Sequence, residues 1–353
     1  MKRFRISAAL LSAALLISLF SGCRRTQTPP DTGSQPSASQ PGAEDSSTRP
    51  GGAEDQYLPN VMFLSGPTGV GAAKLMADSE EADSPCLGSV TIAAANDEVT
   101  AALNSGEADI AAVATNMAAN LYNKTDGKIT MLAVNTLGVL YILEKGDSVQ
   151  RMADLRGRTL YAPSNARGAN PEFILSHLLL QNGVDPGEVE IEWRTPQEIT
   201  TAMVSGESGV CMLPVPAATA LLLKDEGVRQ ALDLSEEWDS VSGTPLAMGC
   251  LVARTDFLRE HPEAAERFLE QYRASIDYMR DPENLEEAAQ LAARYEITAS
   301  AAIAGAAIPQ CNLTFITGEE MRDTIQNYYT VLMAADPVSI GGSLPYDDFY
   351  YIP

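Results

Sequence analysis

The sequence has 353 residues and a formal net charge of −23, from 24 lysines and arginines against 47 aspartates and glutamates. So strong a negative charge disfavours binding to nucleic acid and charge-driven docking on anionic lipid, because an acidic protein is repelled by both. Hydrophobic residues make up 45% of the chain, which is enough for a folded core. Composition therefore indicates a folded, acidic protein whose partners are not polyanions.

The first 22 residues have the organisation of a secretory signal peptide. A cationic start, MKRFR, precedes the apolar run ISAALLSAALLISLF, and Ser21 and Gly22 stand directly before Cys23. A cysteine in this position resembles the lipobox of bacterial lipoproteins, in which the cysteine is acylated and becomes the first residue. Phe20 occupies the position where leucine is usual. A plain signal peptide or an uncleaved anchor is the alternative, and each of these places the body outside the cytoplasm.

The segment that follows has the composition of a spacer. Residues 23–56 are rich in proline, serine, glycine and acids and contain almost no apolar side chains, so we expect them to be disordered. The body, from Tyr57 to Pro353, has about 300 residues, more than one hydrophobic core comfortably supports. Two lobes are therefore expected.

From residue 60 onward, short apolar runs alternate with segments of helical character. Turn-forming residues bound the apolar runs, as they bound buried strands. The first series consists of a strand at 60–64, a helix at 69–76, a strand at 89–95, a helix from Asn96, a strand at 109–114, a helix from Asn116, and strands at 129–138 and 139–145.

A second series begins near residue 151. It comprises strands at 158–162, 188–194, 209–214 and 245–254, and helices at 171–183, 196–207 and 215–227. After Thr255 the pattern is helical, at 262–280, 282–296, 299–307 and 318–335. Such alternation predicts βαβ units, and therefore an α/β fold with mostly parallel sheets flanked by helices.

The segment FLSGPTGVGAAKLM, residues 63–76, joins the first strand to the first helix through three glycines. A Walker loop needs lysine and a hydroxyl residue directly after its last glycine, and Ala72 and Ala73 occupy those positions. A dinucleotide fingerprint also fails, because Lys74 stands where a small residue is needed. The segment is then interpreted as a turn at a helix N-terminus, whose backbone N–H groups can bind an anion or the polar group of a ligand. The alternative is that the glycines serve only the turn.

Three further segments carry a resemblance to a known family. ALNSGEADIAAV (102–113) has the form of a helix, a glycine turn and a strand begun by aspartate. MADLRGRTLYAPSNARGANPEFIL (152–175) has the form of a strand, a glycine-containing loop and a helix, and LVARTDFLREHPEAAERFLEQYRASIDYM (251–279) that of a strand followed by a long helix. In this order they resemble the type II periplasmic binding proteins. Within that group they are most similar to the NMT1/THI5-like (nitrate, sulfonate and thiamine-precursor) substrate-binding lipoproteins of ABC transporters.

The resemblance implies two lobes, each a mostly parallel sheet flanked by helices, with a helical C-terminal region. Lobe I is expected at 57–150 and 245–353, and lobe II at 151–244. In such folds the loops at the carboxyl ends of the strands face the cleft between the lobes. We therefore expect a ligand to be bound by Gly66, Thr68, Gly69, Asn116, Thr136, Gly138, Ser164, Asn165, Arg167, Gly168 and Pro214.

Several of these residues also have structural alternatives. Asn116 serves equally well as a helix cap, and Pro214 as part of a hydrophobic wall or a helix start. Arg167 is either a counter-charge for an acidic ligand or simply a solvated loop residue.

The implied function is that of an extracytoplasmic receptor that delivers a solute to an ABC permease in the membrane. It captures a small polar or anionic molecule as a monomer and is held at the membrane by lipid on Cys23. An enzyme on the same fold, similar to thiamine-pyrimidine synthases, and an extracellular sensory lobe are the alternatives. His177 lies within a helical pattern and His261 at a helix start, so neither looks catalytic, and no cofactor or catalytic residue is expected.

The remaining cysteines are scattered along the body. Cys86, Cys211, Cys250 and Cys311 form no CxxC pair, and neither histidine lies near a cysteine pair. Buried free thiols are the expectation, although a disulfide is possible in an exported protein. No metal site is expected, because neither zinc nor calcium ligand spacing is present.

Overall fold

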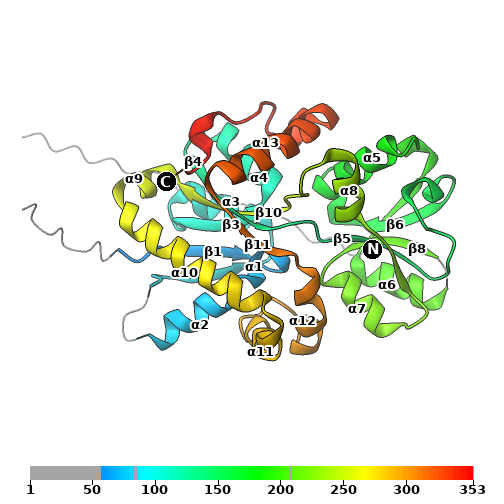
Figure 1. Cartoon of the computed structure of the whole chain (residues 1–353), viewed down its shortest axis with the longest axis horizontal. Coiled ribbons are helices and arrows are strands. Elements are labelled where there is room, and N and C mark those ends of the chain that lie inside the picture. The colour runs from blue at the N-terminus through cyan, green and yellow to red at the C-terminus, as the bar shows by residue number, and fades with distance from the viewer. Residues whose placement is uncertain (1–56, 83–85, 207–208, 353) are drawn as a thin grey trace, which may run out of the picture. The chain divides into compact units, whose positions relative to one another are not determined.

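Two β-sheets, each flanked by helices, make up the part of the chain that the structure, a computed structural model, describes (Figure 1). The described residues are 57–82, 86–206 and 209–352, all within a unit that spans residues 52–353. The predicted signal peptide, Cys23 and the spacer up to residue 56 lie outside them. No helix among the described residues is both long and apolar enough to cross a lipid bilayer.

The first sheet has six strands in the order β11-β4-β10-β3-β1-β2. Strand β1 pairs in parallel with β2 and β3, whereas β10 lies antiparallel between β3 and β4, and β11 is antiparallel to β4. The strands are β1 (Val61–Leu64), β2 (Val90–Ala93), β3 (Ile110–Ala114), β4 (Ile129–Thr136), β10 (Gly249–Arg254) and β11 (Leu313–Ile316).

The second sheet has five strands in the order β7-β6-β8-β5-β9. Strand β6 is parallel to β7 and β8, and β5 is antiparallel to β8 and β9. The strands are β5 (Leu140–Glu144), β6 (Thr159–Pro163), β7 (Glu190–Arg194), β8 (Val210–Pro214) and β9 (Arg229–Asp233).

Thirteen α-helices connect and cover these strands within the described residues. They are α1 (Pro67–Val70), α2 (Ala73–Glu81), α3 (Asn96–Ser105), α4 (Thr115–Lys124), α5 (Asn170–Gln181), α6 (Pro196–Ser205), α7 (Ala217–Lys224), α8 (Leu234–Ser242), α9 (Thr255–Glu260), α10 (Pro262–Arg280), α11 (Leu285–Arg294), α12 (Ala301–Ala307) and α13 (Gly318–Ala335).

The predicted α/β fold is confirmed, but both sheets are mixed and not mostly parallel: parallel pairing is confined to β1 with β2 and β3, and to β6 with β7 and β8. The chain leaves the first sheet at the end of β4 and, after only residues 137–139, enters the second sheet as β5. It returns as β10, which is inserted antiparallel between β3 and β4. Strand β10 begins beside the residue at which β4 ends, since Gly249 pairs with Thr136, so the two strands run in opposite directions.

Three elements were not predicted from the sequence. Strand β9 has the sequence RQALD, which shows little apolar periodicity, and α8 begins at Leu234 directly after it. Strand β11 is only four residues long and pairs irregularly with β4. The two strands depend on tertiary contacts more than on local sequence, whereas α8 has local signals at both ends, namely the cap Asp233 and Gly243, whose φ is 67°.

Local sequence does explain the clearest helix boundaries. Helix α6 begins with a reciprocal cap, in which Thr195 Oγ1 accepts the Glu198 N–H at 3.3 Å and the Glu198 carboxylate accepts the Thr195 N–H at 2.8 Å. It ends at Gly206, whose φ of 80° is readily adopted only by glycine.

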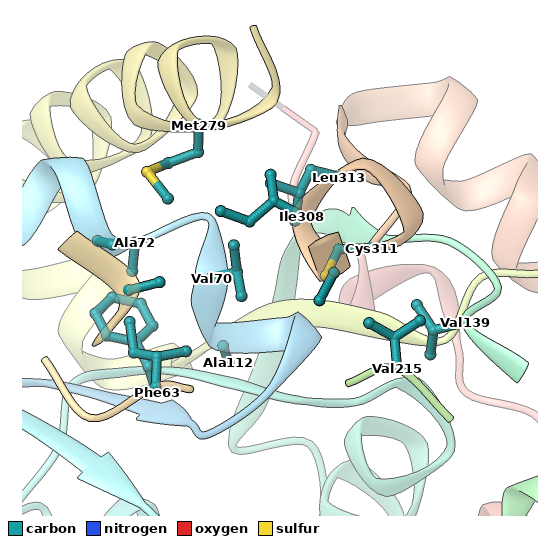
Figure 2. Packing of buried hydrophobic residues seen from close by; sticks show 14 of the residues in the cluster. Phe63, Val70, Ala72, Ala112, Val139, Val215, Met279, Ile308, Cys311 and Leu313 are labelled. Carbon is teal, nitrogen blue, oxygen red and sulfur yellow. The ribbon is translucent and has the colours of Figure 1, made fainter. Parts of the chain in front are cut away.

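Buried apolar side chains form a continuous cluster that reaches from the first sheet to the second. In Figure 2, Phe63 and Ala112 of the first sheet belong to the same cluster as Val215, which follows the last residue of β8. Val139 of the crossover segment and Cys311 of the C-terminal region are part of the same cluster. Burial of this kind contributes about 25 cal/mol per Å² of apolar surface, so the cluster links the two sheets energetically.

Candidate functional site

A pocket of about 240 Å³ lies where the ends of strands from both sheets meet the starts of helices. The first sheet and its helices contribute Asn96, Ala114, Asn116, Met117 and Met248 to its lining. The second sheet and its helices contribute Leu140, Pro163, Asn165, Ala166, Ala169, Asn170, Pro171, Met212 and Pro214. The pocket therefore depends on residues from both sheets.

Three helices, α3, α4 and α5, begin at this pocket. Their N-cap residues are Ala95, Ala114 and Ala169, and none of these helices has a side-chain cap. Thr195, Asp233 and Ser300 cap three other helices, whereas the remaining seven α-helices of the described residues also lack a side-chain cap. Since alanine leaves first-turn N–H groups without a side-chain partner, these three helix starts are suited to receive acceptor atoms of a ligand.

The walls of the pocket are uncharged. Its lining consists of four asparagines, three methionines, three prolines, three alanines and one leucine. Carboxylates do occur nearby in the first turns of two of the helices: Asp97 and Glu98 in α3, and Glu172 in α5. Glu98 accepts the Ala94 N–H at 3.3 Å, and Glu172 accepts the Gly168 N–H. These acids offset part of the positive potential of the α3 and α5 N-termini.

Two of the asparagines are held by the C-terminal region. Asn116, which is 8% exposed, has its amide nitrogen 3.5 Å from the carbonyl oxygen of Ser339. Asn170, which is 4% exposed, accepts a hydrogen bond from the hydroxyl of Tyr328 in α13. Burial raises the pKa of Tyr328 well above its ordinary value, so this hydroxyl keeps its proton and acts as a donor.

Three residues of the predicted site, Asn116, Asn165 and Pro214, line the pocket. They come from the start of α4, the loop after β6 and the end of β8, so the structure brings together residues that are up to about 100 positions apart. Their contact with a ligand remains a prediction.

The glycine loop lies at the same edge of the first sheet but is not part of the pocket lining. Gly66 has a φ of 91°, and its N–H donates to the Ile297 carbonyl at 3.1 Å. A methyl group on Gly69 would lie 2.3 Å from the Leu64 carbonyl oxygen, and the Thr68 carbonyl accepts from Asn135 at 3.0 Å. Each of these positions has a packing role, and the binding role predicted for Gly66, Thr68 and Gly69 remains a prediction.

Thr136 is the last residue of β4 and Gly138 lies in the crossover segment, residues 137–139; both are buried, and neither is in the pocket lining. Thr136 is 1% exposed and donates to Asn135 Oδ1 at 3.2 Å. A methyl group on Gly138 would lie 2.1 Å from Ser235 Oγ, so this glycine permits close packing against the start of α8.

The remaining predicted residues, Ser164, Arg167 and Gly168, lie on the exposed loop after β6. They flank Asn165 and Ala166, which do line the pocket. Gly168 adopts a φ of 67°, which turns the chain into α5. Arg167 is thus near the pocket without lining it, and its role as a counter-charge remains a prediction.

Sequence reasoning did not select Asn96, Asn170 or the three methionines of the pocket. From the sequence, Asn96 is expected only as the start of a helix, and Asn170 only as the residue directly before one. The sequence does contain a signal for these residues: an asparagine stands at or beside the start of three helices that follow strands. The ends of such strands meet at one edge of a sheet, so these asparagines are expected to lie close together.

Cys86, Cys211, Cys250 and Cys311 are free thiols, and the last three are buried. Burial raises the pKa of Cys211 and of Cys311 to about 12, which keeps both protonated. Among the described residues, no group of three or more histidine, cysteine or acidic side chains is arranged to hold a metal ion.

Comparison with known proteins places this geometry in a family. The NMT1/THI5-like family model matches residues 87–285, which is more than half of the chain. The chain belongs to the NMT1/THI5-like family. None of the curated protein sequences matches it.

Solved structures show the same fold at low sequence identity. An ABC transporter protein from Parabacteroides distasonis is 24% identical, with a TM-score of 0.69 over 84% of this chain and 98% of the other. The periplasmic aliphatic sulphonate binding protein SsuA from Escherichia coli is 16% identical, with a TM-score of 0.67 over 84% and 92%. The periplasmic nitrate-binding protein NrtA from Synechocystis PCC 6803 is 15% identical, with a TM-score of 0.55 over 83% of each chain. This family member therefore has the two-lobed α/β fold of periplasmic binding proteins.

Proposed function

We propose that this protein is an extracytoplasmic solute-binding lipoprotein that captures a small polar or anionic molecule and delivers it to an ABC importer. The observation that carries the proposal is the pocket lined by both sheets, with three uncapped helix starts around it. The membership in the NMT1/THI5-like family and the named sulfonate- and nitrate-binding neighbours support it.

The two sheets are the centres of the proposed lobes. Lobe I was expected at residues 57–150 and 245–353, and lobe II at residues 151–244. Strand β5 pairs within the second sheet, so the first crossing between lobes falls at residues 137–139 and not near residue 150. Closure around a solute is favoured only by contacts that the closed state makes, and residues from both lobes line the pocket.

The chemistry of the pocket favours binding over catalysis. General acid–base or nucleophilic catalysis needs a titratable side chain at the substrate, and the described lining residues are asparagine, methionine, proline, alanine and leucine. An enzyme of this family would need a lysine, a histidine or a carboxylate in that place. This lining supports a receptor role over a catalytic one. The proposal adds lipid on Cys23 as the membrane anchor and a permease as the partner.

Calorimetry and thermal-shift titration with sulfonates, nitrate, pyrimidines, flavins and dicarboxylates test the proposal. We expect one of these solutes to bind at a single site and to raise the melting temperature, because a ligand that binds only the folded state stabilises it. Ala169→Leu, which fills the pocket, should abolish that binding. Ala274→Leu, at an exposed alanine of α10 outside the pocket lining, is the matched control and should leave the binding intact. A flat response to every solute, or equal binding by Ala169→Leu, contradicts the proposal.

A further inference from the structure

Two amide atoms at the pocket have no hydrogen-bond partner. Asn96 Oδ1 and Asn170 Nδ2 are both shielded from solvent and unpaired among the described residues, and both residues line the pocket. Asn96 opens α3 of the first sheet, and Asn170 opens α5 of the second. Seven other buried side-chain atoms of the described residues also lack a hydrogen-bond partner, and none of them belongs to a residue of the pocket lining. Buried polar atoms are usually paired in folded proteins, so the two unpaired amide atoms at the pocket favour partners supplied by a ligand.

Tyr328 determines which atom of the Asn170 side-chain amide has no hydrogen-bond partner. Its hydroxyl donates to Asn170 Oδ1, which leaves the amide nitrogen as the free end. Tyr328 is itself fully buried, and its ring lies 5.6 Å from that of Trp238, measured between centroids. The hydrogen bond from Tyr328 thus holds the Asn170 amide in one orientation, and packing in the core holds Tyr328 itself.

The two unpaired amide atoms have opposite hydrogen-bonding roles. Asn170 offers an N–H donor and Asn96 offers a carbonyl acceptor, so a ligand that pairs with both carries one acceptor and one donor. An anion such as a sulfonate supplies acceptors only and would leave Asn96 Oδ1 unpaired. The pocket lining contains no cation to offset an anion's loss of hydration, and Asp97, Glu98 and Glu172 stand nearby in the first turns of α3 and α5.

We propose that the pocket takes a compact, uncharged molecule that bears both a carbonyl-type acceptor and an N–H donor, such as a primary amide, a lactam or a urea. Asn170 donates to the carbonyl, Asn96 accepts the N–H, and Tyr328 is the positioning residue that keeps the Asn170 donor available. The thioether side chains of Met117, Met212 and Met248 adapt to the apolar remainder of the molecule. This inference rests on the proposed function, whose solute class it narrows.

Four probes of similar size test the ligand class by calorimetry on the full chain. Benzamide carries both groups, N,N-dimethylbenzamide the acceptor only, aniline chiefly the donor, and benzenesulfonate a charged acceptor. We expect benzamide to bind at least about tenfold more tightly than each of the others, because each of them leaves one amide atom unpaired. Absence of benzamide binding, or benzenesulfonate binding as tight as that of benzamide, overturns the inference.

Variants identify the residues responsible. Asn170→Asp removes the donor and Asn96→Leu removes the acceptor, so each should weaken benzamide binding about tenfold or more. Asn104→Asp, at an exposed asparagine of α3 outside the pocket lining, is the control and should change it less than about threefold. In Tyr328→Phe the Asn170 amide is free to rotate, so the preference for benzamide over aniline should fall. A purely structural role of Tyr328 would lower the melting temperature and leave that preference unchanged, which overturns its assignment as a positioning residue.

Native mass spectrometry of the protein after incubation with a bacterial small-molecule extract separates this inference from the proposed function. A captured neutral solute with an N–H donor supports both. A captured anion without such a donor refutes the inference and leaves the receptor function standing. Capture of nothing, together with a flat response in the titrations, refutes both.

Discussion

The amide nitrogen of Asn135 lies 2.8 Å from the hydroxyl oxygen of Tyr272, and it also donates to the Thr68 carbonyl at 3.0 Å. One side chain at the end of β4 thereby ties the glycine loop to helix α10. A second tie comes from Ser275 of the same helix, whose hydroxyl bonds to the carbonyl of Gly71 and accepts from the N–H of Leu75. The loop that looks most like a ligand cradle in the sequence is therefore anchored on its inner side by buried polar contacts.

Gly69→Ala tests what this loop does. A methyl group at Gly69 would meet the Leu64 carbonyl oxygen at 2.3 Å, and backbone cannot move aside as a flexible side chain can. We expect the free energy of unfolding to fall by about 1–3 kcal/mol, as it does when a close-packed site is overfilled. Urea denaturation measures this change.

The matched control is Gly305→Ala. A methyl group there would lie 3.7 Å from the Ala289 side chain, an ordinary contact, and alanine favours the helix. Stability should stay unchanged or rise by up to about 1 kcal/mol. If folded Gly69→Ala also loses solute binding, the loop contacts the ligand as the sequence predicts; unchanged binding confines it to packing.

The order of strands and helices was readable from the sequence because apolar runs and turn residues alternate regularly along the body. The starts of α4 and α5 and the end of β8 were located correctly for the same reason, and this placed Asn116, Asn165 and Pro214 near one sheet edge. The sequence did not show where along the sheet edge each of these residues lies. Gly66 and Asn116 both follow parallel strands, yet the pocket lining includes only Asn116.

The missing information is tertiary. Strand β10 enters between β3 and β4 and brings Met248 to the pocket, and no local pattern encodes that insertion. Asn170 gains its orientation from Tyr328, which lies 158 residues further along the chain. Asparagine is also a common helix-capping residue, so its local sequence does not distinguish a cap from a ligand contact.

Glu144 provides a test of stability in the second sheet. This carboxylate is 2% exposed, and burial alone would raise its pKa. Hydrogen bonds from Ser148, Val149 and Arg229 outweigh burial and hold the pKa below its ordinary value. A lowered pKa stabilises the fold at pH values above the ordinary carboxyl pKa, and this contribution is lost as pH falls through the folded-state pKa.

Glu144→Gln should therefore lower the free energy of unfolding at pH 7 by about 1–3 kcal/mol, since it leaves Arg229 without its charged partner. The difference in the free energy of unfolding between wild type and variant should become smaller in acid, where the wild-type carboxylate is protonated. Glu260→Gln, at an exposed carboxylate paired with Arg259, should change stability by less than about 0.5 kcal/mol. A deficit that does not vary between pH 7 and pH 3 would contradict this account.

His177 predicts a second pH dependence, in a different range. Burial lowers the pKa of this imidazole, which lies against Trp238 with ring centroids 5.1 Å apart. The folded state thus favours the neutral ring, and its contribution to stability is complete above pH ~6.5 and declines as pH falls through the lowered folded-state pKa. His177→Gln should flatten the fall in melting temperature below pH ~6.5, where histidine ordinarily titrates. His261→Gln, at the chain's other histidine, is the control, and an equal flattening in both variants would reject the assignment to His177.

Cys23→Ser tests the proposed anchor. If Cys23 is acylated, cells grown with labelled palmitate incorporate label into the wild-type protein and not into the variant, because serine cannot carry the thioether-linked lipid. Cys86→Ser is the matched control and should keep the label, since Cys86 lies in the body of the protein and is only partly buried. Mass spectrometry of the mature N-terminus should show an acylated cysteine at position 23. A wild-type protein that retains residues before position 23, or that takes up no label, is instead held by an uncleaved segment or secreted free.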